Sequence, residues 1–212
     1  MELIRNDFKE EIKSAKMFFK SISNIKDVDT QYMMYSSMVL ILYNIIESTT
    51  SKILARLHDE IIRQCDNGLK YHDFNGNIKT VIYKSNCINQ SGRKFNFNHL
   101  ESLKIKPFKP DDEYGKFHLN GNVDAKRIKE IFEEYGISEL KCGLCDKLYQ
   151  LKLDRQKLAH GNQTFTEYGQ RTSKEDIQRY LQSVRGTLFN AINNAETYIN
   201  KRYFEKNNSS QL

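Results

Sequence analysis

The chain has 212 residues, a mass of 25.0 kDa and a formal net charge of +6 at pH 7. Hydrophobic residues make up 39% of it and charged residues 28%, and it contains only 10 glycines and 2 prolines. This composition excludes collagen-like, low-complexity and wholly disordered proteins, and it is typical of one globular domain. We therefore expect residues 1–212 to form a single domain.

Two amphipathic helices are predicted in the first third of the chain. Apolar residues recur at helical spacing over residues 8–22, which predicts a first helix that ends around Ser23. A second helix begins after the potential caps Asp27 and Asp29 and can continue to about Gln64. A helix of this length without proline or glycine is typical of the central element of a helical bundle.

The most apolar segment of the chain lies within this second helix, from Met33 to Ile46. Polar residues interrupt it and Glu47 follows it, so we expect it to be too short and too polar to span a bilayer. The first turns of the chain carry charged residues instead of the apolar core of a secretory signal. We therefore expect a cytoplasmic protein without a membrane partner.

Residues 67–122 differ from the helical pattern around them. They hold both prolines and half of the glycines, and short β-rich runs occur at 79–83 and 94–97. This pattern predicts a partly β, loop-rich insertion between the second and third long helices.

The insertion is also basic and rich in aromatic residues. Between residues 67 and 110, eight basic residues stand against two acidic ones, and this excess of six equals that of the whole chain. Aromatic rings close to cations are typical of RNA-binding surfaces, although the rings can equally form a small satellite core. Our candidate nucleic-acid contacts are Lys94, Lys104 and Lys106, beside the aromatic residues Tyr71, Phe74, Tyr83, Phe95, Phe97 and Phe108.

Three further helices are expected after the insertion. Asp124 can cap a short helix that ends at Tyr135, and residues 138–160 predict the third long helix. A capping box from Thr172 to Glu175 then opens the last helix, which keeps one apolar face. The expected fold is therefore an all-α, four-helix bundle that carries a partly β insertion.

A zinc site is possible but weakly indicated. Cys142 and Cys145 form a C-x-x-C pair, and zinc would need two more ligands. Candidates are scattered along the chain and form no second close pair: Cys65, Cys87, His99 and His118. Two small thiols packed against neighbouring residues explain the pair equally well, so we expect no metal and no other cofactor.

The third long helix carries ionisable residues in an unusual place. Leu144, Leu148, Leu151, Arg155 and Leu158 follow the spacing of one helical stripe, so Arg155 occupies a position where leucine is expected. An arginine is rarely buried without a partner or a function. His160 follows, directly before a glycine that can end the helix, where the helix dipole favours a protonated imidazole.

Arg155 and His160 lie in the segment Arg-Gln-Lys-Leu-Ala-His-Gly, which resembles the Arg-x(4 to 6)-His signature of the HEPN superfamily of all-α ribonuclease domains. Residues 120–124, 135–137 and 158–162 are similar to a prokaryotic branch associated with toxin and phage-defence loci. The resemblance covers residues 29–201 apart from the insertion.

The resemblance implies a metal-independent endoribonuclease that acts as a homodimer, with two Arg155 and His160 pairs facing each other across a cleft. Its substrate would be RNA, and a cognate antitoxin or another defence protein would be a possible partner. We expect Glu47 to orient Arg155, with a plain core-edge carboxylate as the alternative, and we expect Gln156 and Asn162 to support the site.

One position departs from the pattern of active HEPN members. The residue after the arginine is usually Asn, Asp or His, whereas this chain has Gln156, whose longer side chain aims differently. A non-catalytic HEPN module that binds nucleic acid or a partner subunit is therefore the alternative. A helical adaptor, in which the arginine and histidine only stabilise a dimer, is the third possibility.

Overall fold

The structure is a computed structural model that describes residues 1–87, 104–119, 121–140 and 145–208. These residues form helices and contain no β-strand, which confirms the predicted all-α fold. The elements in chain order are α1 (Glu2–Ile22), α2 (Val28–Asp66), the 3₁₀ helix η1 (Tyr71–Asp73), α3 (Gly76–Cys87), α4 (Glu113–His118), α5 (Ala125–Tyr135), α6 (Cys145–Ala159), α7 (Phe165–Gln170) and α8 (Lys174–Asn200).

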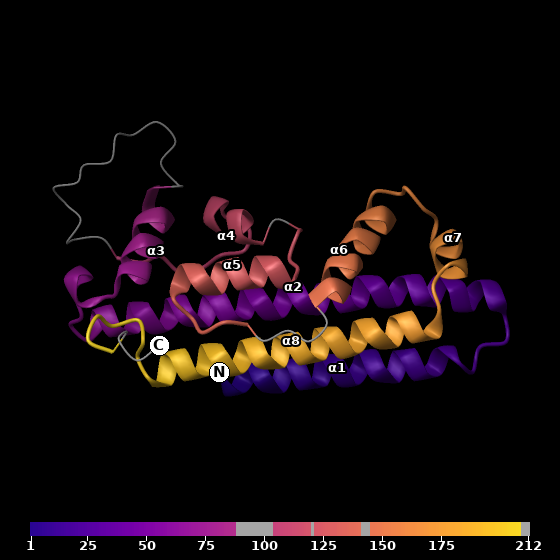
Figure 1. Cartoon of the computed structure of the whole chain (residues 1–212), viewed down its shortest axis with the longest axis horizontal. Coiled ribbons are helices and arrows are strands. Elements are labelled where there is room, and N and C mark those ends of the chain that lie inside the picture. Colours follow the sequence, from indigo (N-terminus) through magenta and orange to yellow (C-terminus); the bar gives the residue numbers. More distant parts are fainter. Residues whose placement is uncertain (88–103, 120, 141–144, 209–212) are drawn as a thin grey trace.

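The 39-residue helix α2 is the central element of the fold. It lies beside α1 and α8 along the long axis of the molecule, while α3 to α7 lie on one side of this layer (Figure 1). The side chain of Asp27 caps its first turn by accepting a hydrogen bond from the backbone N–H of Thr30 at 2.8 Å. Met38, Leu42 and Ile46, on successive turns, are fully buried, so this helix supplies the middle of the hydrophobic core.

By length and composition alone α2 could cross a membrane, which differs from our expectation for this segment. However, 56% of its most apolar stretch is buried inside the fold. Its packing against α1, α6, α7 and α8 accounts for its apolar character, because a helix that contacts several neighbours is apolar around most of its circumference.

The prediction that the insertion is partly β is wrong for the residues that the structure describes. The β-rich run at 79–83 lies inside α3, and the run at 94–97 lies outside the described residues. Ile78, Val81 and Ile82 are all buried, which is the spacing of one helical face. The side chain of Asn75 caps this helix by accepting a hydrogen bond from the N–H of Ile78 at 2.9 Å. Packing and capping therefore override the β preference of these residues.

Several helix boundaries also differ from the predictions, and α1 begins at Glu2, six residues before the predicted start. Within the described residues α6 begins only at Cys145, and residues 138–140 before it are not helical. Helix α7 was not predicted, although a capping box between Thr164 and Glu167 opens it. The capping box of α8 lies one residue later than expected, between Ser173 and Asp176. The short α5, capped by Asp124, is as predicted.

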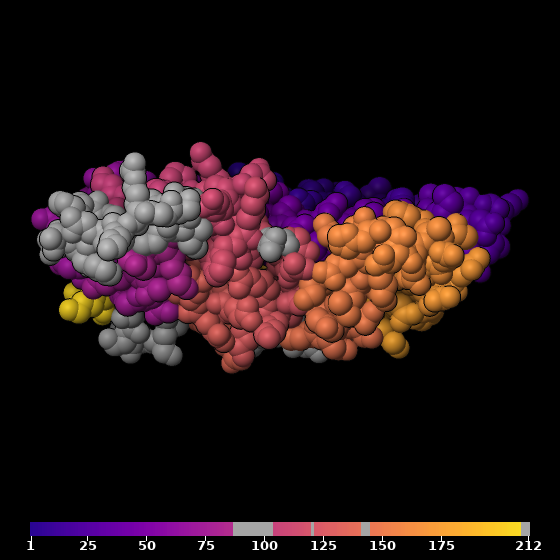
Figure 2. Space-filling view, turned by 90° about the horizontal axis from the view of Figure 1, so that it is seen from above, coloured from indigo at the N-terminus to yellow at the C-terminus, as the bar shows by residue number. Residues whose placement is uncertain are grey.

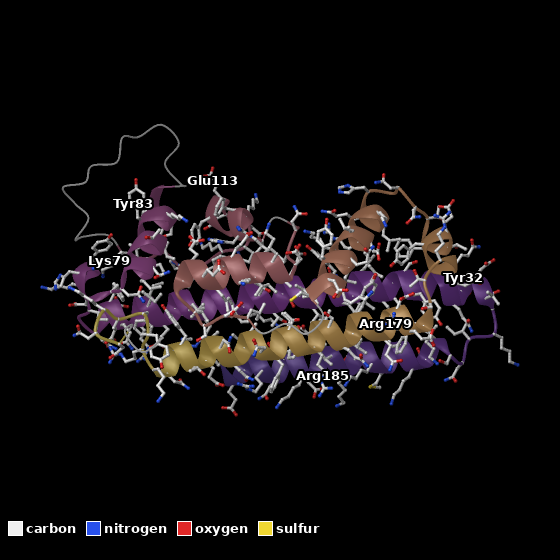
Figure 3. All side chains as sticks on the ribbon, viewed as in Figure 1. Tyr32, Lys79, Tyr83, Glu113, Arg179 and Arg185 are labelled. Atoms are coloured by element: carbon white, nitrogen blue, oxygen red, sulfur yellow. The ribbon has the colours of Figure 1, made fainter. Side chains whose placement is uncertain are left out.

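Helix α7 packs on α2 through the backbone of Gly169. A Cβ atom at this position would lie 2.1 Å from the carbonyl oxygen of Tyr32, which Figure 3 shows where α2 passes α7. A side chain at this contact is therefore impossible unless α7 moves away from α2.

We predict that Gly169→Ala lowers the free energy of unfolding by about 1–3 kcal/mol, because the added methyl group overpacks this contact. For a chain of this size each kcal/mol corresponds to a fall in Tm of roughly 2–4 °C, which thermal unfolding followed by circular dichroism would detect. The matched control is Gly76→Ala, since a Cβ atom there has no neighbour within 4 Å. Equal melting temperatures for the two variants would contradict the tight packing of α7.

Candidate active site

Helix α6 is held in place by a buried carboxylate. Leu148, Leu151 and Leu158 face the core as predicted, but Asp154 shares their face and has only 4% of its surface exposed. The hydroxyls of Tyr168 and Tyr180 both donate to its Oδ2 at 2.7 Å. Asp154 is therefore the buried charge of this stripe, which corrects the expectation that Arg155 occupies that position.

The same carboxylate connects three helices. Gln150 and Lys157, both on α6, donate to its other oxygen at 2.9 Å and 3.1 Å. Burial and the hydrogen bond to Asp154 raise the pKa of Tyr180, and burial raises that of Tyr168, so both phenols stay protonated and continue to donate. Because Tyr168 lies on α7 and Tyr180 on α8, Asp154 fixes α6 against both.

Arg155, one position further along α6, lies at the edge of the buried stripe and is half-buried. Its guanidinium carbon is 4.9 Å from the centre of the Tyr43 ring, a distance at which a cation is attracted to the face of an aromatic ring. Its terminal nitrogens lie 3.7 Å and 4.0 Å from where a Cβ atom of Gly121 would be. No hydrogen bond or ion pair involves this guanidinium among the residues that the structure describes.

The side chain of Tyr43 lies between those of Arg155 and Glu47 and contacts both. The phenolic oxygen of Tyr43 accepts a hydrogen bond from the N–H of Val123 at 2.9 Å and lies 3.4 Å from Oε1 of Glu47, to which its O–H can donate. Burial raises the pKa of the Glu47 carboxyl, against the opposing attraction of Arg155. Glu47 and Arg155 form no direct ion pair, so any orienting effect of this carboxylate acts through space and through the Tyr43 ring.

A cleft of about 510 Å³ lies next to this group. Glu47 and Gly121 contribute to its wall, so Arg155 lies directly behind one side of it. The other lining residues are Ser48, Ser51, Pro110, Asp111, Lys116 and Leu119. Figure 2 looks down on the side of the molecule that carries α3 to α7.

His160 lies just beyond the last residue of α6, and its side chain is exposed. Gly161, at a φ of +68°, allows the N–H of Asn162 to donate to the carbonyl of Lys157 and its own N–H to donate to that of Leu158. These two hydrogen bonds form a Schellman motif, so the predicted glycine stop of the helix is confirmed. Asn162 is exposed, and no interaction joins the side chains of Arg155 and His160 within the described part of the chain.

Gln156 does not reach towards the cleft residues. Its side-chain amide donates a hydrogen bond to the side-chain oxygen of Asn122, in the loop before α5. The two flanking charges, Lys152 on α6 and Asp124 at the start of α5, form an ion pair beside it. Gln156 therefore helps to fasten the 121–124 loop, the loop that also contacts Arg155 and Tyr43, to α6.

The candidate nucleic-acid contacts in the insertion remain apart from this group. Lys104 is exposed and lies 3.7 Å from Asp66, and Lys106 is exposed, whereas Lys94 lies outside the described residues. Phe74 and Phe108 are buried and belong to the core, so for these two rings the satellite-core interpretation is correct. Tyr71 and Tyr83 remain half-buried, and Phe95 and Phe97 lie outside the described residues.

Sequence reasoning missed several residues of this site. Tyr43, Gly121, Asn122 and Asp154 all contact or hold the predicted residues, as described above. Tyr43 could have been found, because it precedes Glu47 by one helical turn and the two therefore share a face. The pairing of Asn122 with Gln156 had no local signal, since 34 residues separate them.

Two buried histidines, His58 and His118, lie in the core near α4. His58 is fully buried, and its two ring nitrogens lie 2.6 Å from the carbonyl of Lys106 and 2.6 Å from the hydroxyl of Tyr135. His118 of α4, which also supplies Lys116 to the cleft, packs edge-on against Tyr114 with ring centres 4.5 Å apart. Burial lowers the pKa of His58 to about 4 and that of His118 to about 3, so both rings are neutral in the folded protein at pH 7.

The described residues contain no cluster of three or more histidine, cysteine or acidic side chains arranged to hold a metal ion. Of the candidate zinc ligands, Cys142 and His99 lie outside the described residues, as does the side chain of Cys87. His118 is enclosed by aromatic rings, and Cys65 is half-buried at the end of α2.

The family of the chain is shown by a family model described as MAE_28990-like HEPN, which matches residues 3–204. The chain therefore belongs to this HEPN family, as the Arg155 and His160 motif predicted. Domains of the HEPN class are often ribonucleases. Comparisons with curated proteins and with solved structures found no significant match.

We predict that acid destabilises the protein through His58. Its pKa is lower in the folded state than the ordinary value of 6.5, so below pH 6.5 the unfolded chain binds more protons and stability falls until about pH 4. The full loss from this residue is roughly 3 kcal/mol, at 1.36 kcal/mol per pKa unit. Urea unfolding of the wild type and of His58→Gln between pH 7.5 and pH 4 would measure it, with exposed His72→Gln as the control. Parallel curves for the wild type and His58→Gln would contradict the prediction.

Proposed function

We propose that this chain is a metal-independent endoribonuclease of toxin or phage-defence type that cleaves RNA with Arg155 and His160. The observation that carries the proposal is the guanidinium of Arg155, which forms no ion pair among the described residues and lies beside Gly121, a residue of the cleft wall. A half-buried cation in this state is costly unless an anion approaches it. An RNA phosphate is an anion that matches its planar, bidentate geometry.

The proposed reaction is transesterification by the 2′-hydroxyl of the RNA. The 2′-oxygen attacks phosphorus and loses its proton to a base, while the bond from phosphorus to the 5′-oxygen breaks and that oxygen receives a proton from an acid. The products are a 2′,3′-cyclic phosphate and a 5′-hydroxyl. Arg155 would stabilise the charge on the phosphorane, and the imidazole of His160 would serve as base or acid.

A homodimer would supply what one subunit lacks. His160 follows Arg155 by five positions, which on a helix separates them by about 140° around the axis and by about 7 Å along it. The two side chains of one subunit therefore do not converge by helix geometry alone. In a two-fold dimer, His160 at the exposed end of α6 would instead approach Arg155 of the second copy, so that the dimer would hold two shared Arg155–His160 pairs.

A non-catalytic module is the second candidate, and Gln156 favours it. Its amide is engaged with Asn122 instead of being directed to a phosphate. In that case the exposed cations of the insertion, Lys104 and Lys106, would bind RNA or an acidic partner without cleavage. Glu47 and Asn162 would then have structural roles only.

We predict that the purified protein cleaves RNA in the presence of EDTA and leaves 2′,3′-cyclic phosphate ends. Arg155→Ala and His160→Ala should each reduce the rate by about 10²-fold or more, since each removes a group that acts in the transition state. Denaturing gels with end-labelled RNA and mass spectrometry of the products would measure this.

The matched controls for these variants are Arg179→Ala and His72→Ala, because both side chains are exposed and each pairs only with a carboxylate close to it in the chain, outside the candidate site. Cleavage that persists in both Arg155→Ala and His160→Ala would exclude this site. Salt-sensitive RNA binding without cleavage, weakened by Lys104→Glu, would favour the non-catalytic module.

A further prediction concerns the division of the site between subunits. If Arg155 of one copy works with His160 of the other, mixing the inactive Arg155→Ala and His160→Ala proteins under conditions of subunit exchange should restore activity. Half of the random dimers would then be mixed and each would hold one intact pair, so we expect about a quarter of the wild-type rate. Analytical ultracentrifugation at micromolar concentration should give the mass of a dimer. A strictly monomeric species that still cuts RNA would refute the shared site.

A further inference from the structure

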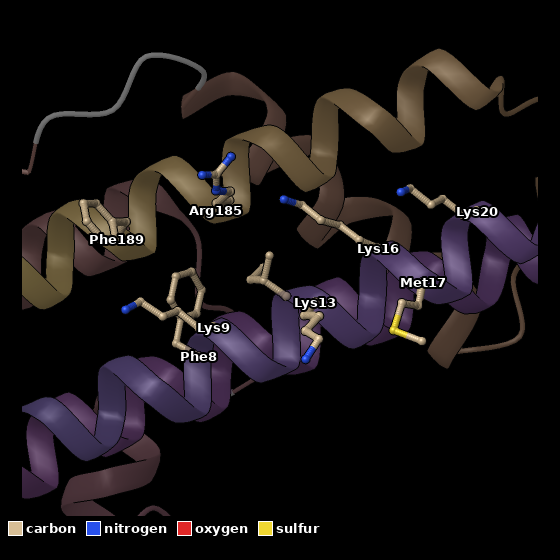
Figure 4. Close-up of a pocket in the computed structure, with 9 residues that line it drawn as sticks. Phe8, Lys9, Lys13, Lys16, Met17, Lys20, Arg185 and Phe189 are labelled. Atoms are coloured by element: carbon tan, nitrogen blue, oxygen red, sulfur yellow. The ribbon is translucent and has the colours of Figure 1, made fainter.

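A second groove lies between α1 and α8. Figure 1 shows these two helices along the edge of the molecule away from α4 and the end of α6. It has a volume of about 390 Å³, and the buried residues Phe8 and Ile12 contribute to its apolar part. Its remaining lining residues are Lys9, Lys13, Lys16, Met17 and Lys20 from α1, and Arg185 and Phe189 from α8 (Figure 4).

The charges of α1 are segregated around this groove. Lys9, Lys13, Lys16 and Lys20 follow the 4, 3, 4 spacing of one helical face and extend over about 16 Å at 1.5 Å per residue. The acidic residues Asp7 and Glu11 are drawn to the other side of the helix, where both form ion pairs with Lys52 of α2, at 3.2 Å and 3.1 Å. Two of the four carboxylates of α1 are thus directed away from the lysines of this face.

The cations of the groove are also poorly neutralised by other elements. Lys13 pairs with exposed Glu10 at 3.3 Å, but within the described residues no ion pair involves Lys9, Lys16, Lys20 or Arg185. Lys16 extends from α1 towards the side of Arg185 on α8 (Figure 4). Bringing like charges together is unfavourable, and an anionic occupant would offset this cost. By contrast, the basic residues of α5 all face glutamates: Lys126, Arg127 and Lys129.

Exposed apolar side chains accompany these charges. Met17 is 64% exposed and Phe189 is 45% exposed, and both line the groove. Large apolar side chains beside a buried apolar floor are typical of a surface that another protein covers. A nucleic-acid partner accounts less well for these exposed apolar side chains, because a sugar-phosphate backbone gains little from contact with Met17. In addition, the guanidinium of Arg5 lies 5.6 Å from the ring centre of Phe189 and so covers one face on which a base could stack.

We propose that the groove between α1 and α8 binds an acidic amphipathic helix of a partner protein. Apolar residues at i, i+3, i+4 and i+7 of that helix contact Phe8, Met17 and Phe189, and its flanking carboxylates pair with the lysines of α1 and with Arg185. Basic residues line both edges of the groove, on α1 and on α8, and they favour an acidic partner. Because the groove lies away from Arg155, this inference does not depend on the proposed nuclease activity.

The test uses the full chain and a synthetic probe of about 18 residues, with leucines along one helical face and glutamates on both sides of them. Fluorescence anisotropy at physiological salt should show saturable binding. Lys16→Glu and Arg185→Glu should each weaken it about tenfold by charge repulsion, and Met17→Ser should weaken it through lost apolar contact. Lys126→Glu on α5, the matched control, should leave binding unchanged, because this exposed lysine lies outside the groove.

Three outcomes would overturn the proposal. Equal affinity for a probe with every leucine changed to serine would show attraction by charge alone. Tighter binding of a single-stranded RNA, lost in Lys16→Glu, would make the groove a nucleic-acid surface, and self-association lost in the same variant would make it a contact between copies of this chain. Absence of binding to the probe would also exclude it. None of these results bears on cleavage by Arg155 and His160, which the groove variants should retain.

Discussion

The placement of the candidate site depends on one buried interaction, the carboxylate of Asp154 accepting hydrogen bonds from Tyr168 and Tyr180. A buried charge is tolerated only when its hydrogen bonds are satisfied, and four donors satisfy this one. Because the two phenols lie on α7 and α8, the interaction fixes both the position of α6 and its rotation about its own axis. That rotation decides where the next residue, Arg155, can extend.

With Asp154 turned into the core, Arg155 is turned towards α2 and the 121–124 loop. It meets Tyr43, whose ring face attracts the guanidinium and whose hydroxyl holds both the backbone of Val123 and the carboxyl of Glu47. None of these contacts satisfies the N–H donors of the arginine, and the partial burial of Glu47 favours its neutral form. The Tyr43 ring thus contacts the face of the Arg155 guanidinium, while the N–H donors of Arg155 stay available. This arrangement suits the binding of an anion better than it suits a structural ion pair.

The sequence predicted the helical periodicity and several caps, but not the orientation of the candidate site residues. The leucine spacing of α6 predicted that Arg155 faces the core, whereas in the structure Asp154 faces the core. Neighbouring residues on a helix are 100° apart, so the leucines alone do not decide which of two adjacent residues lies at the edge of the buried face. The run at 79–83 was misread as β because its residues favour strands locally, whereas Asn75 and the packing against α5 impose a helix. The link from Gln156 to Asn122 joins residues distant in the chain, and no local pattern encodes such a pairing.

Charged side chains are arranged differently on the two sides of the helical layer. On the side of α4 to α7, Asp154 is satisfied by hydrogen bonds and His58 is held neutral, and within the described residues Arg155 forms no ion pair. On the side of α1 and α8, cations gather around exposed apolar side chains, while Asp7 and Glu11 of α1 pair with Lys52 on the other side of that helix. A site that must recognise a phosphate needs a positioned, partly desolvated cation, whereas a surface that binds a helix needs apolar area bordered by charge. One bundle can present two such different surfaces because helical periodicity directs neighbouring residues to different faces.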